Sequence, residues 1–171
     1  AMHAILQPVR EGERAGFVNA QREWLFGQHV RASGACGWQP MNMFDQPEVE
    51  QFLREHALAQ PSVSAFVPCT ANACSQTGAG VSVACTDAEG SHFTLTARYL
   101  IGCDGAASPT RKALDIEWID LGYDQDWLVV DVEMIAPHDL GVTTMQVCDP
   151  ERIATYVCTK DPYRRWEFKL N

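Results

Sequence analysis

The residues best suited to chemistry lie in the stretch CDGAASPTR, near the middle of the chain. Asp104 and Gly105 are followed by two alanines, and Ser108, Pro109 and Arg111 complete the stretch. A carboxylate is a hydrogen-bond acceptor, and small residues beside it leave no bulk against a ligand that approaches the backbone. Serine followed by proline predicts a helix start, since serine accepts a hydrogen bond from the first turn and proline lacks the N–H that would be orphaned there. The stretch predicts a ligand-binding junction, although a turn that needs only a small residue and a cap has the same composition.

The element that must position Asp104 is the apolar run before it. Tyr99–Cys103 is short and nearly continuous in apolar residues, which favours a strand covered on both faces. Open α/β sheets receive ligands where such a strand ends and a helix begins, because free N–H groups and the helix dipole face outward there. We therefore expect Tyr99–Cys103 to be an interior strand with Asp104 at its carboxyl end.

The segment QPEVEQFLREHAL has the clearest helical pattern. Its apolar residues follow helical spacing, and a proline with glutamates suits a first turn, so we predict a helix that begins near Gln46. The residues of the apolar face are Val49, Phe52, Leu53 and Ala57. We expect this face to pack into the core.

The remaining pattern is mostly that of strands, which makes the fold class α+β. Alternating apolar and polar residues predict an antiparallel hairpin across residues 81 to 97, with DAEG as its turn. The preceding GAGVSV resembles the opening of a dinucleotide fingerprint but lacks its third glycine, so we interpret it as a hairpin loop. Further strands are predicted in DWLVVDVEMI, ERIATYVCT and RRWEFKLN, the last with Trp166 and Phe168 opposite Arg165 and Glu167. Weaker strand and loop patterns fill the first quarter of the chain.

The composition limits the possible partners. The chain has 171 residues, 46% of them hydrophobic, and its 13 Lys and Arg stand against 22 Asp and Glu, a formal charge of −9. Such a charge repels a nucleic-acid backbone. No apolar run has membrane-spanning length and the first residues lack the features of a secretory leader, so we expect no membrane contact and a cytoplasmic protein. The seven cysteines form no C-x-x-C pair and the five histidines are dispersed, which argues against a metal site and favours reduced cysteines in the core.

Three ordered motifs resemble one enzyme family. YLIGCDGAASPTR resembles the Asp-Gly motif of the group A flavoprotein monooxygenases, the family of p-hydroxybenzoate hydroxylase. GWQPMNMFDQPEVEQFL is similar to the segment leading into the Gln-Pro helix of the 3-(3-hydroxyphenyl)propionate hydroxylase branch. WLVVDVEM, QVCDPERIATYV and RRWEFKL are similar to strands of its substrate domain. The resemblance covers roughly residues 35 to 171, and three motifs in order are more specific than one.

The resemblance implies a partial FAD- and NAD(P)-binding fold with antiparallel substrate-domain strands. It implies substrate-side strands and loops in residues 1–45, part of the FAD-binding domain in 46–116, and substrate-domain strands in 117–171. It singles out the cofactor-binding residues Gln46, Asp104, Gly105, Ser108 and Arg111. Arg111 has two possible roles, a bond to a cofactor phosphate or a structural tie, and we favour the second.

The activity implied is hydroxylation of a phenolic ring. In this family NAD(P)H reduces FAD, the reduced flavin adds O2 to form a C4a-hydroperoxide, and that species hydroxylates the ring. The flavin carries this chemistry while the protein orients the substrate and excludes water, so no residue here is nominated as a catalytic acid or base. Four aromatic residues, Trp127, Tyr156, Trp166 and Phe168, are candidates either for a substrate pocket or for the core, and we favour the core.

The sequence also departs from the family pattern. The N-terminal G-x-G-x-x-G motif and the C-terminal Gly-Asp flavin motif are both missing from these residues. We therefore expect an internal piece of a longer enzyme that is inactive and retains FAD poorly by itself. We also expect exposed apolar sheet surface and self-association through an unpaired strand edge near Trp166. The alternatives are a non-catalytic binding module that keeps part of the fold, or a flavin-dependent halogenase or epoxidase that shares it.

Overall fold

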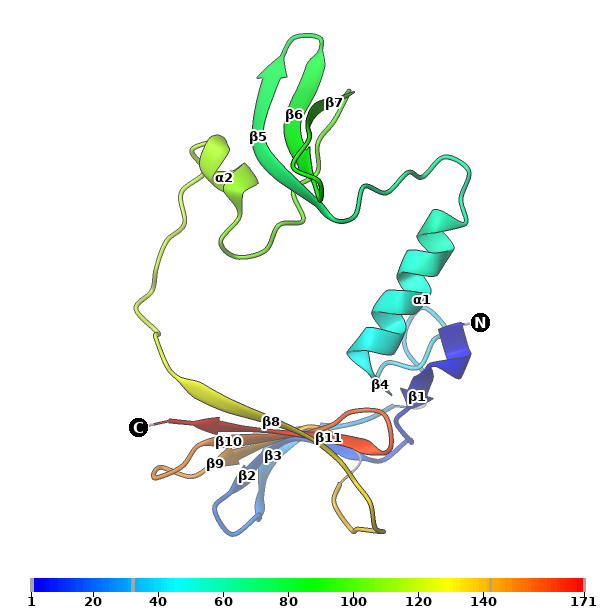
Figure 1. Ribbon diagram of the computed structural model, residues 1–171. Coiled ribbons are helices and arrows are strands. Elements are labelled where there is room, and N and C mark those ends of the chain that lie inside the picture. Colours follow the sequence, from blue (N-terminus) through cyan, green and yellow to red (C-terminus); the bar gives the residue numbers. More distant parts are fainter. Residues whose placement is uncertain (1, 32, 142, 171) are drawn as a thin grey trace. The chain divides into compact units, whose positions relative to one another are not determined.

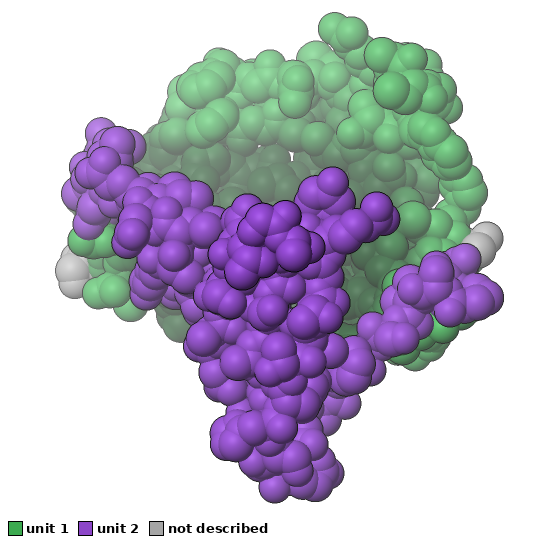
Figure 2. Space-filling model, turned by 90° about the horizontal axis from the view of Figure 1, so that it is seen from above, with its two compact units in different colours: residues 1–59, 124–171 green, residues 60–123 purple. Residues whose placement is uncertain are grey.

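The computed structural model describes residues 2–31, 33–141 and 143–170, which form two compact units (Figures 1 and 2). Unit 1 comprises residues 1–59 and 124–171, and unit 2 comprises residues 60–123. This division keeps the helix after Gln46 with the sheet of unit 1. The assignment of residues 46–116 to a cofactor domain stays a prediction.

Unit 1 is built on a six-stranded sheet in the order β3-β2-β9-β10-β11-β8. Its strands are β2 (Arg14–Asn19), β3 (Trp24–His29), β8 (Trp127–Glu133), β9 (Met145–Cys148), β10 (Ala154–Cys158) and β11 (Tyr163–Lys169). All neighbours are antiparallel except β2 and β9, so the sheet is mixed and joins both ends of the chain. The strands predicted from alternation are confirmed. The expected free edge near Trp166 is wrong, because β11 is hydrogen-bonded to β10 on one side and β8 on the other.

The two faces of the sheet differ in chemistry, as alternation along β11 predicts. Arg165 and Glu167 line a cavity on one face, whereas Trp166 and Phe168 line another cavity. The ring of Trp166 packs against that of Tyr156 on β10, with 5.4 Å between centroids.

The helix α1 (Gln46–Leu58) begins where the sequence predicts. It follows the short strand β4 (Asn42–Phe44), which pairs with β1 (Leu6–Pro8). A single 3-10 turn at Met2–Ala4 precedes β1. The Asp45 side chain caps the helix by accepting a hydrogen bond from the Glu48 backbone N–H at 3.3 Å. Figure 1 shows α1, β1 and β4 on one side of the sheet of this unit.

The apolar face of α1 does not pack into a core, so that expectation is wrong. The Leu53 side chain is 52% exposed, and Phe52 is only half-buried. The nearby buried cluster is small and consists of Val9, Val30 and Met43. The physical reason is that no described element of unit 1 covers the helix beyond its first turns.

Unit 2 contains a three-stranded antiparallel sheet. β6 (Gly80–Asp87) and β7 (His92–Ala97) form the predicted hairpin, with the turn fastened by two backbone N–H groups that donate to Asp87 Oδ1. β5 (Cys69–Thr77) adds a third strand that the sequence analysis did not predict, and the glycine-containing segment before β6 is the hairpin loop we expected. The helix α2 (Pro109–Ala113) starts at the predicted Ser-Pro pair.

The interior strand predicted at Tyr99–Cys103 is not formed. The segment is irregular, and the side chains of Tyr99 and Ile101 are 80% and 82% exposed. A strand needs a hydrogen-bonded neighbour, and no described strand pairs with these residues. The apolar composition of this run suits burial, but composition alone does not provide a neighbouring strand to pair with it.

The seven cysteines differ in their exposure. All seven cysteines are free thiols, but only Cys85 and Cys158 are buried, so the expectation of core cysteines holds for these two alone. The described part of the chain contains no group of three or more His, Cys, Asp or Glu residues that could hold a metal ion. None of the helices in that part is long and apolar enough to cross a membrane.

Candidate functional site

The Asp-Gly loop of unit 2 is organised around one carboxylate. Ser108 Oγ donates to Asp104 Oδ1 at 2.6 Å, and the Thr110 backbone N–H donates to Oδ2 at 2.9 Å. Ser108 Oγ also accepts from the Arg111 backbone N–H at 2.9 Å, which makes it the cap of α2. Four of the five predicted cofactor residues, Asp104, Gly105, Ser108 and Arg111, therefore lie in one hydrogen-bonded loop.

The Asp104 carboxylate is held ionised. The hydrogen bonds from Ser108 and then from Thr110 shift the pKa of Asp104 well below its ordinary value. The residue is exposed, and two hydrogen bonds leave a carboxylate with further lone pairs. Asp104 can therefore accept additional hydrogen bonds from hydroxyl groups of a ligand.

Gly105 is required by the backbone of this loop. Its φ is +74°, in the left-handed region that residues with a side chain rarely adopt, and a Cβ built there would meet no atom within 4 Å. The space beside the residue is open, as the small residues of the motif predict.

Arg111 is engaged within unit 2. Its Nη1 donates to the Ala106 carbonyl oxygen at 2.6 Å, and its guanidinium carbon lies 4.6 Å from the centre of the Trp118 ring. These contacts fasten the Asp-Gly loop to the segment after α2. They support the structural role that we favoured for this residue.

Gln46, the fifth predicted residue, belongs to unit 1. Its Nε2 donates to Glu50 Oε1 at 2.7 Å within the first turn of α1. Asp45 already occupies the helix N-terminus and Pro47 has no N–H, which leaves little room for the anionic group that the helix dipole would attract. Gln46 instead lines a cavity of about 570 Å³ between β4, the start of α1 and the sheet.

This first cavity is polar on the sheet side. Arg165 Nε and Nη2 donate to the two oxygens of Asp131 on the neighbouring strand β8, at 2.7 and 2.9 Å. The hydrogen bonds from Arg165 lower the pKa of Asp131 below its ordinary value, and Asp131 raises the pKa of Arg165, so both groups are charged. Glu167 stands two residues further along the same face. The sequence placed Arg165 and Glu167 on one face but gave no signal for Asp131, because strand register cannot be read from the pattern alone.

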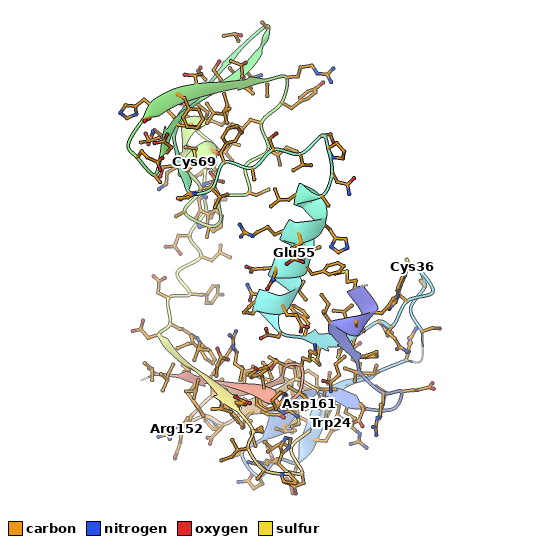
Figure 3. The ribbon with its side chains drawn as sticks, turned by 45° about the vertical axis from the view of Figure 1, so that its right-hand side comes forward. Trp24, Cys36, Glu55, Cys69, Arg152 and Asp161 are labelled. Carbon is orange, nitrogen blue, oxygen red and sulfur yellow. The ribbon has the colours of Figure 1, made fainter. Side chains whose placement is uncertain are left out.

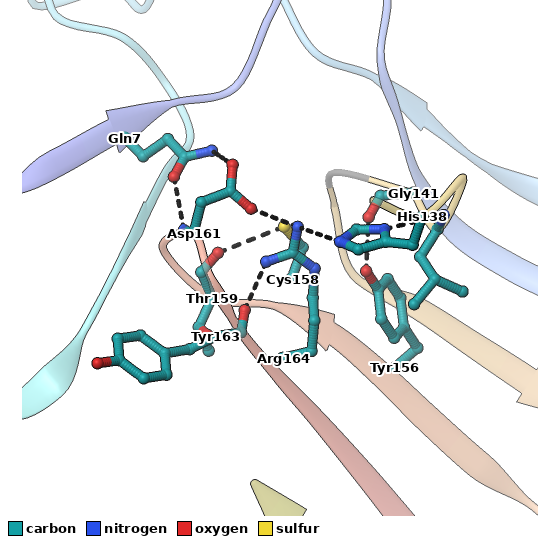
Figure 4. Close-up of polar contacts among 10 residues, drawn as sticks. Gln7, His138, Gly141, Tyr156, Cys158, Thr159, Asp161, Tyr163 and Arg164 are labelled. Atoms are coloured by element: carbon teal, nitrogen blue, oxygen red, sulfur yellow. Dashed lines mark hydrogen bonds and ion pairs between the residues drawn. The ribbon is translucent and has the colours of Figure 1, made fainter. Parts of the chain in front are cut away.

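The buried side chain of Arg164 stabilises the turn between β10 and β11, at the edge of this cavity (Figure 4). The Arg164 side chain is only 2% exposed; it forms an ion pair with the Asp161 carboxylate and donates to the Tyr163 carbonyl oxygen at 2.6 Å. Its Nη2 also lies 3.3 Å from His138 Nε2. The sequence analysis missed Arg164, yet alternation places it on the same face of β11 as Trp166, and a charge at such a position signals a buried, paired group.

The same turn connects the sheet to β1 and α1. Asp161, labelled in Figure 3, accepts a hydrogen bond from Gln7 Nε2 at 3.0 Å and donates its backbone N–H to Gln7 Oε1 at 2.8 Å. Lys160 Nζ pairs with Glu48 Oε2 of α1 at 2.7 Å. The start of α1 is thus placed over the sheet by polar contacts.

A second cavity of about 440 Å³ lies on the other face of the sheet. Tyr156, Trp166 and Phe168, which the sequence offered as pocket or core residues, line it. The Tyr156 hydroxyl donates to the Gly141 carbonyl oxygen at 2.6 Å, and Tyr156 is buried, so it is a core residue. Trp127 is 37% exposed and lines neither cavity.

Comparison with known families identifies the fold. A family model described as an FAD binding domain matches residues 9–168. The chain belongs to this FAD-binding family. It is 33% identical over 155 residues to a probable NADH-specific resorcinol 4-hydroxylase of Rhodococcus jostii, a match that covers 90% of this chain and 29% of the relative. It is 34% identical over 132 residues to a 3-(3-hydroxy-phenyl)propionate/3-hydroxycinnamic acid hydroxylase of Burkholderia vietnamiensis, covering 77% of this chain and 24% of the relative.

Solved structures agree with the family assignment at the level of fold. A flavoprotein/dehydrogenase from Cytophaga hutchinsonii matches with a TM-score of 0.75 and 13% identity, covering 99% of this chain and 41% of that one. Aklavinone-11 hydroxylase, solved with FAD and aklavinone, matches with a TM-score of 0.60 and 20% identity over 95% of this chain and 34% of that one. The chain spans less than a third of the length of the two hydroxylases of Rhodococcus jostii and Burkholderia vietnamiensis. The resemblance to flavoprotein aromatic hydroxylases is confirmed.

The Asp-Gly loop fits a sugar-bearing cofactor such as FAD. Asp104 offers a charged, exposed acceptor for hydroxyl groups, and the space beside Gly105 is open. Ser108 is already used twice within the loop, so it acts through Asp104 rather than on a ligand. The assignment of Gln46, Asp104, Gly105, Ser108 and Arg111 to the cofactor site stays a prediction.

Proposed function

We propose that the whole protein is an FAD-dependent hydroxylase of small phenolic compounds that takes its electrons from NAD(P)H. The observation that carries the proposal is the first cavity, in which Gln46 lies beside the charged face of the sheet in a chain of the FAD-binding family. A volume of about 570 Å³ is within the range of small-molecule sites. The names of both relatives describe hydroxylases of phenolic compounds, and one of them specifies NADH.

The residues of this chain bind and orient, while the flavin, when bound, supplies the activation of dioxygen. Asp104 would accept hydrogen bonds from cofactor hydroxyls, and the Gln46 amide, which lines the first cavity, would be a further contact to the cofactor. Arg165 and Asp131 fix each other, so the sheet presents a rigid polar face to the ring. We expect further cofactor contacts from outside these residues, and little FAD retention by these residues alone.

Among enzymes that share the fold, a hydroxylase is favoured over a halogenase or epoxidase by the names of the two relatives. The non-catalytic alternative predicts no flavin turnover in the whole protein. The second cavity is the weaker candidate for the substrate, since no predicted cofactor residue lines it.

The test is turnover by the whole protein loaded with FAD. We expect NADH oxidation and oxygen uptake to depend on an added phenol, with one hydroxyl group added to the ring by mass spectrometry and little hydrogen peroxide formed. Asp104→Ala should lower the flavin content after desalting or slow flavin reduction in stopped flow. Asp87→Ala is the matched control, because Asp87 also accepts two backbone hydrogen bonds in unit 2 but lies in a hairpin turn. Flavin content and reduction rate equal to wild type for Asp104→Ala would refute the cofactor role, and absence of any phenol-dependent turnover would refute the proposed function.

A further inference from the structure

Charge distinguishes the first cavity from a neutral aromatic slot. Its wall carries four carboxylates and one guanidinium, a formal balance of −3. The carboxylates are those of Asp45, Glu50, Asp131 and Glu167, and the guanidinium is that of Arg165. The whole chain is acidic as well, with a formal charge of −9. A ligand carboxylate that enters this cavity therefore meets charges of its own sign rather than a free cation.

The one cation in the wall is already neutralised. Two N–H groups of Arg165 are taken by the two oxygens of Asp131, at 2.7 and 2.9 Å. A substrate carboxylate would have to displace Asp131, which would leave that aspartate unpaired beside the incoming charge. Lys160, a cation in the turn between β10 and β11, is paired with Glu48 at 2.7 Å and does not line the cavity.

The positive end of α1 does not change this balance. An N-terminus attracts anions through its free N–H groups. Here the Asp45 carboxylate caps the helix, and Pro47 contributes no N–H. Glu50 adds a further negative charge in the following turn.

The same wall suits hydroxyl groups. Glu167 is half-buried and receives no hydrogen bond from the described residues, so its oxygens are available to a donor. Asp131 keeps lone pairs beyond those that Arg165 uses. A phenolic O–H donated to a carboxylate makes a short, strong hydrogen bond, and Phe44 and Tyr163 supply apolar contact for the ring.

We propose that the first cavity selects uncharged phenols, of which a benzenediol is the simplest, and discriminates against phenols that carry a carboxylate. This inference rests on the proposed function, since it takes the first cavity as the aromatic substrate site. It assigns the specificity to Asp131 and Glu167, which accept the phenolic hydroxyls and repel a substrate anion.

The test compares two ligands that differ in charge but hardly in shape, 3-(3-hydroxyphenyl)propionate and its amide. Equilibrium dialysis against the FAD-loaded whole protein at neutral pH and low salt measures binding without turnover. We expect the amide to bind about tenfold more tightly, the effect of one net like charge at roughly 8 Å in partly screened surroundings. The ratio should shrink as salt is added.

Variants assign the discrimination to the cavity. Glu167→Gln should reduce the amide-to-acid ratio about threefold or more, while Glu151→Gln, the same change in an exposed turn, should leave it unchanged. If circular dichroism shows that Glu167→Gln is unfolded, Asp131→Asn, at the other carboxylate to which the specificity is assigned, makes the same test. Equal or tighter binding of the acid, or a ratio that neither cavity variant moves, would overturn the inference.

The two proposals fail in different ways. Hydroxylation of the acid in preference to the amide and to resorcinol would leave the proposed function standing and overturn the selectivity. Absence of binding and of turnover for all three compounds would overturn both. Preferred binding and hydroxylation of resorcinol and the amide would support both.

Discussion

Replacing Arg164 by alanine should destabilise the sheet of unit 1 by about 3 kcal/mol. The guanidinium is 2% exposed and joins three elements: the Asp161 carboxylate in the turn before β11, the Tyr163 carbonyl oxygen, and His138 in the loop after β8. Alanine removes all these contacts and leaves a space where the side chain lay. The substitution therefore weakens both the packing around Arg164 and the hydrogen bonds and ion pair that hold the turn.

The size of the destabilisation depends on whether the former partners of Arg164 stay buried or regain contact with water after the substitution. Breaking a buried ion pair costs about 3–5 kcal/mol when the remaining charge stays buried. The Asp161 side chain is 59% exposed and regains water, which places the loss at the lower end of that range. Methionine keeps most of the volume of Arg164, so Arg164→Met should lose about 1 kcal/mol less than alanine.

Urea unfolding followed by tryptophan fluorescence measures the effect, because four of the five tryptophans belong to unit 1 and only Trp118 lies in unit 2. Arg152→Ala is the control, since Arg152 is an exposed arginine in the turn between β9 and β10. The reasoning would be refuted by a loss below about 1 kcal/mol for Arg164→Ala, or by equal losses for the two arginines.

Three further predictions concern the pH dependence, the helix and the exposed segment. The pKa values of Asp131 and Asp161 are lowered in the folded state, chiefly by hydrogen bonds from their arginine partners. The stability that these two carboxylates contribute should therefore be complete above about pH 4 and lost as pH falls through the lowered pKa values. Urea unfolding at pH 7 and at pH 3 measures this loss. Lys160→Met should speed hydrogen exchange in the first turns of α1 by releasing Glu48, with a loss of stability below about 1 kcal/mol because the pair is partly exposed. The 171-residue chain by itself should self-associate in light scattering, and Ile101→Ser should reduce this, because that side chain is 82% exposed.

Each of these has an outcome that contradicts it. A double variant Asp131→Asn, Asp161→Asn with the same acid profile as wild type would show that other carboxylates dominate. Unchanged exchange in α1 after Lys160→Met would mean that the helix is held by other contacts. A monodisperse monomer at high concentration would show that the exposed apolar side chains do not drive association.

Local patterns predicted the elements that carry their own signals. The start of α1 was predictable because Pro47 and the glutamates after it lie within the first turns, and the β6–β7 hairpin because its turn residues fix the register. The cap and the carboxylate network of the Asp-Gly loop also lie within a few residues of each other. Such contacts need no information from distant parts of the chain.

What was missed depends on partners far away in the sequence. Asp131 meets Arg165 only because β8 and β11 pair in one register. The Tyr99–Cys103 run has the composition of a buried strand, but composition does not provide the neighbour that would pair with it. For the same reason the apolar face of α1 was expected in a core that the described residues do not form.

The turn between β10 and β11 links the stability of the sheet to the chemistry of the first cavity. Arg164 fixes Asp161, Asp161 holds Gln7 of β1, and the adjacent Lys160 holds Glu48 of α1. Apolar contact between the helix and the sheet is sparse, so these directional polar contacts determine where Gln46 stands relative to the charged face of the sheet. A change in the turn should therefore alter ligand binding in the cavity even though neither Arg164 nor Lys160 lines it.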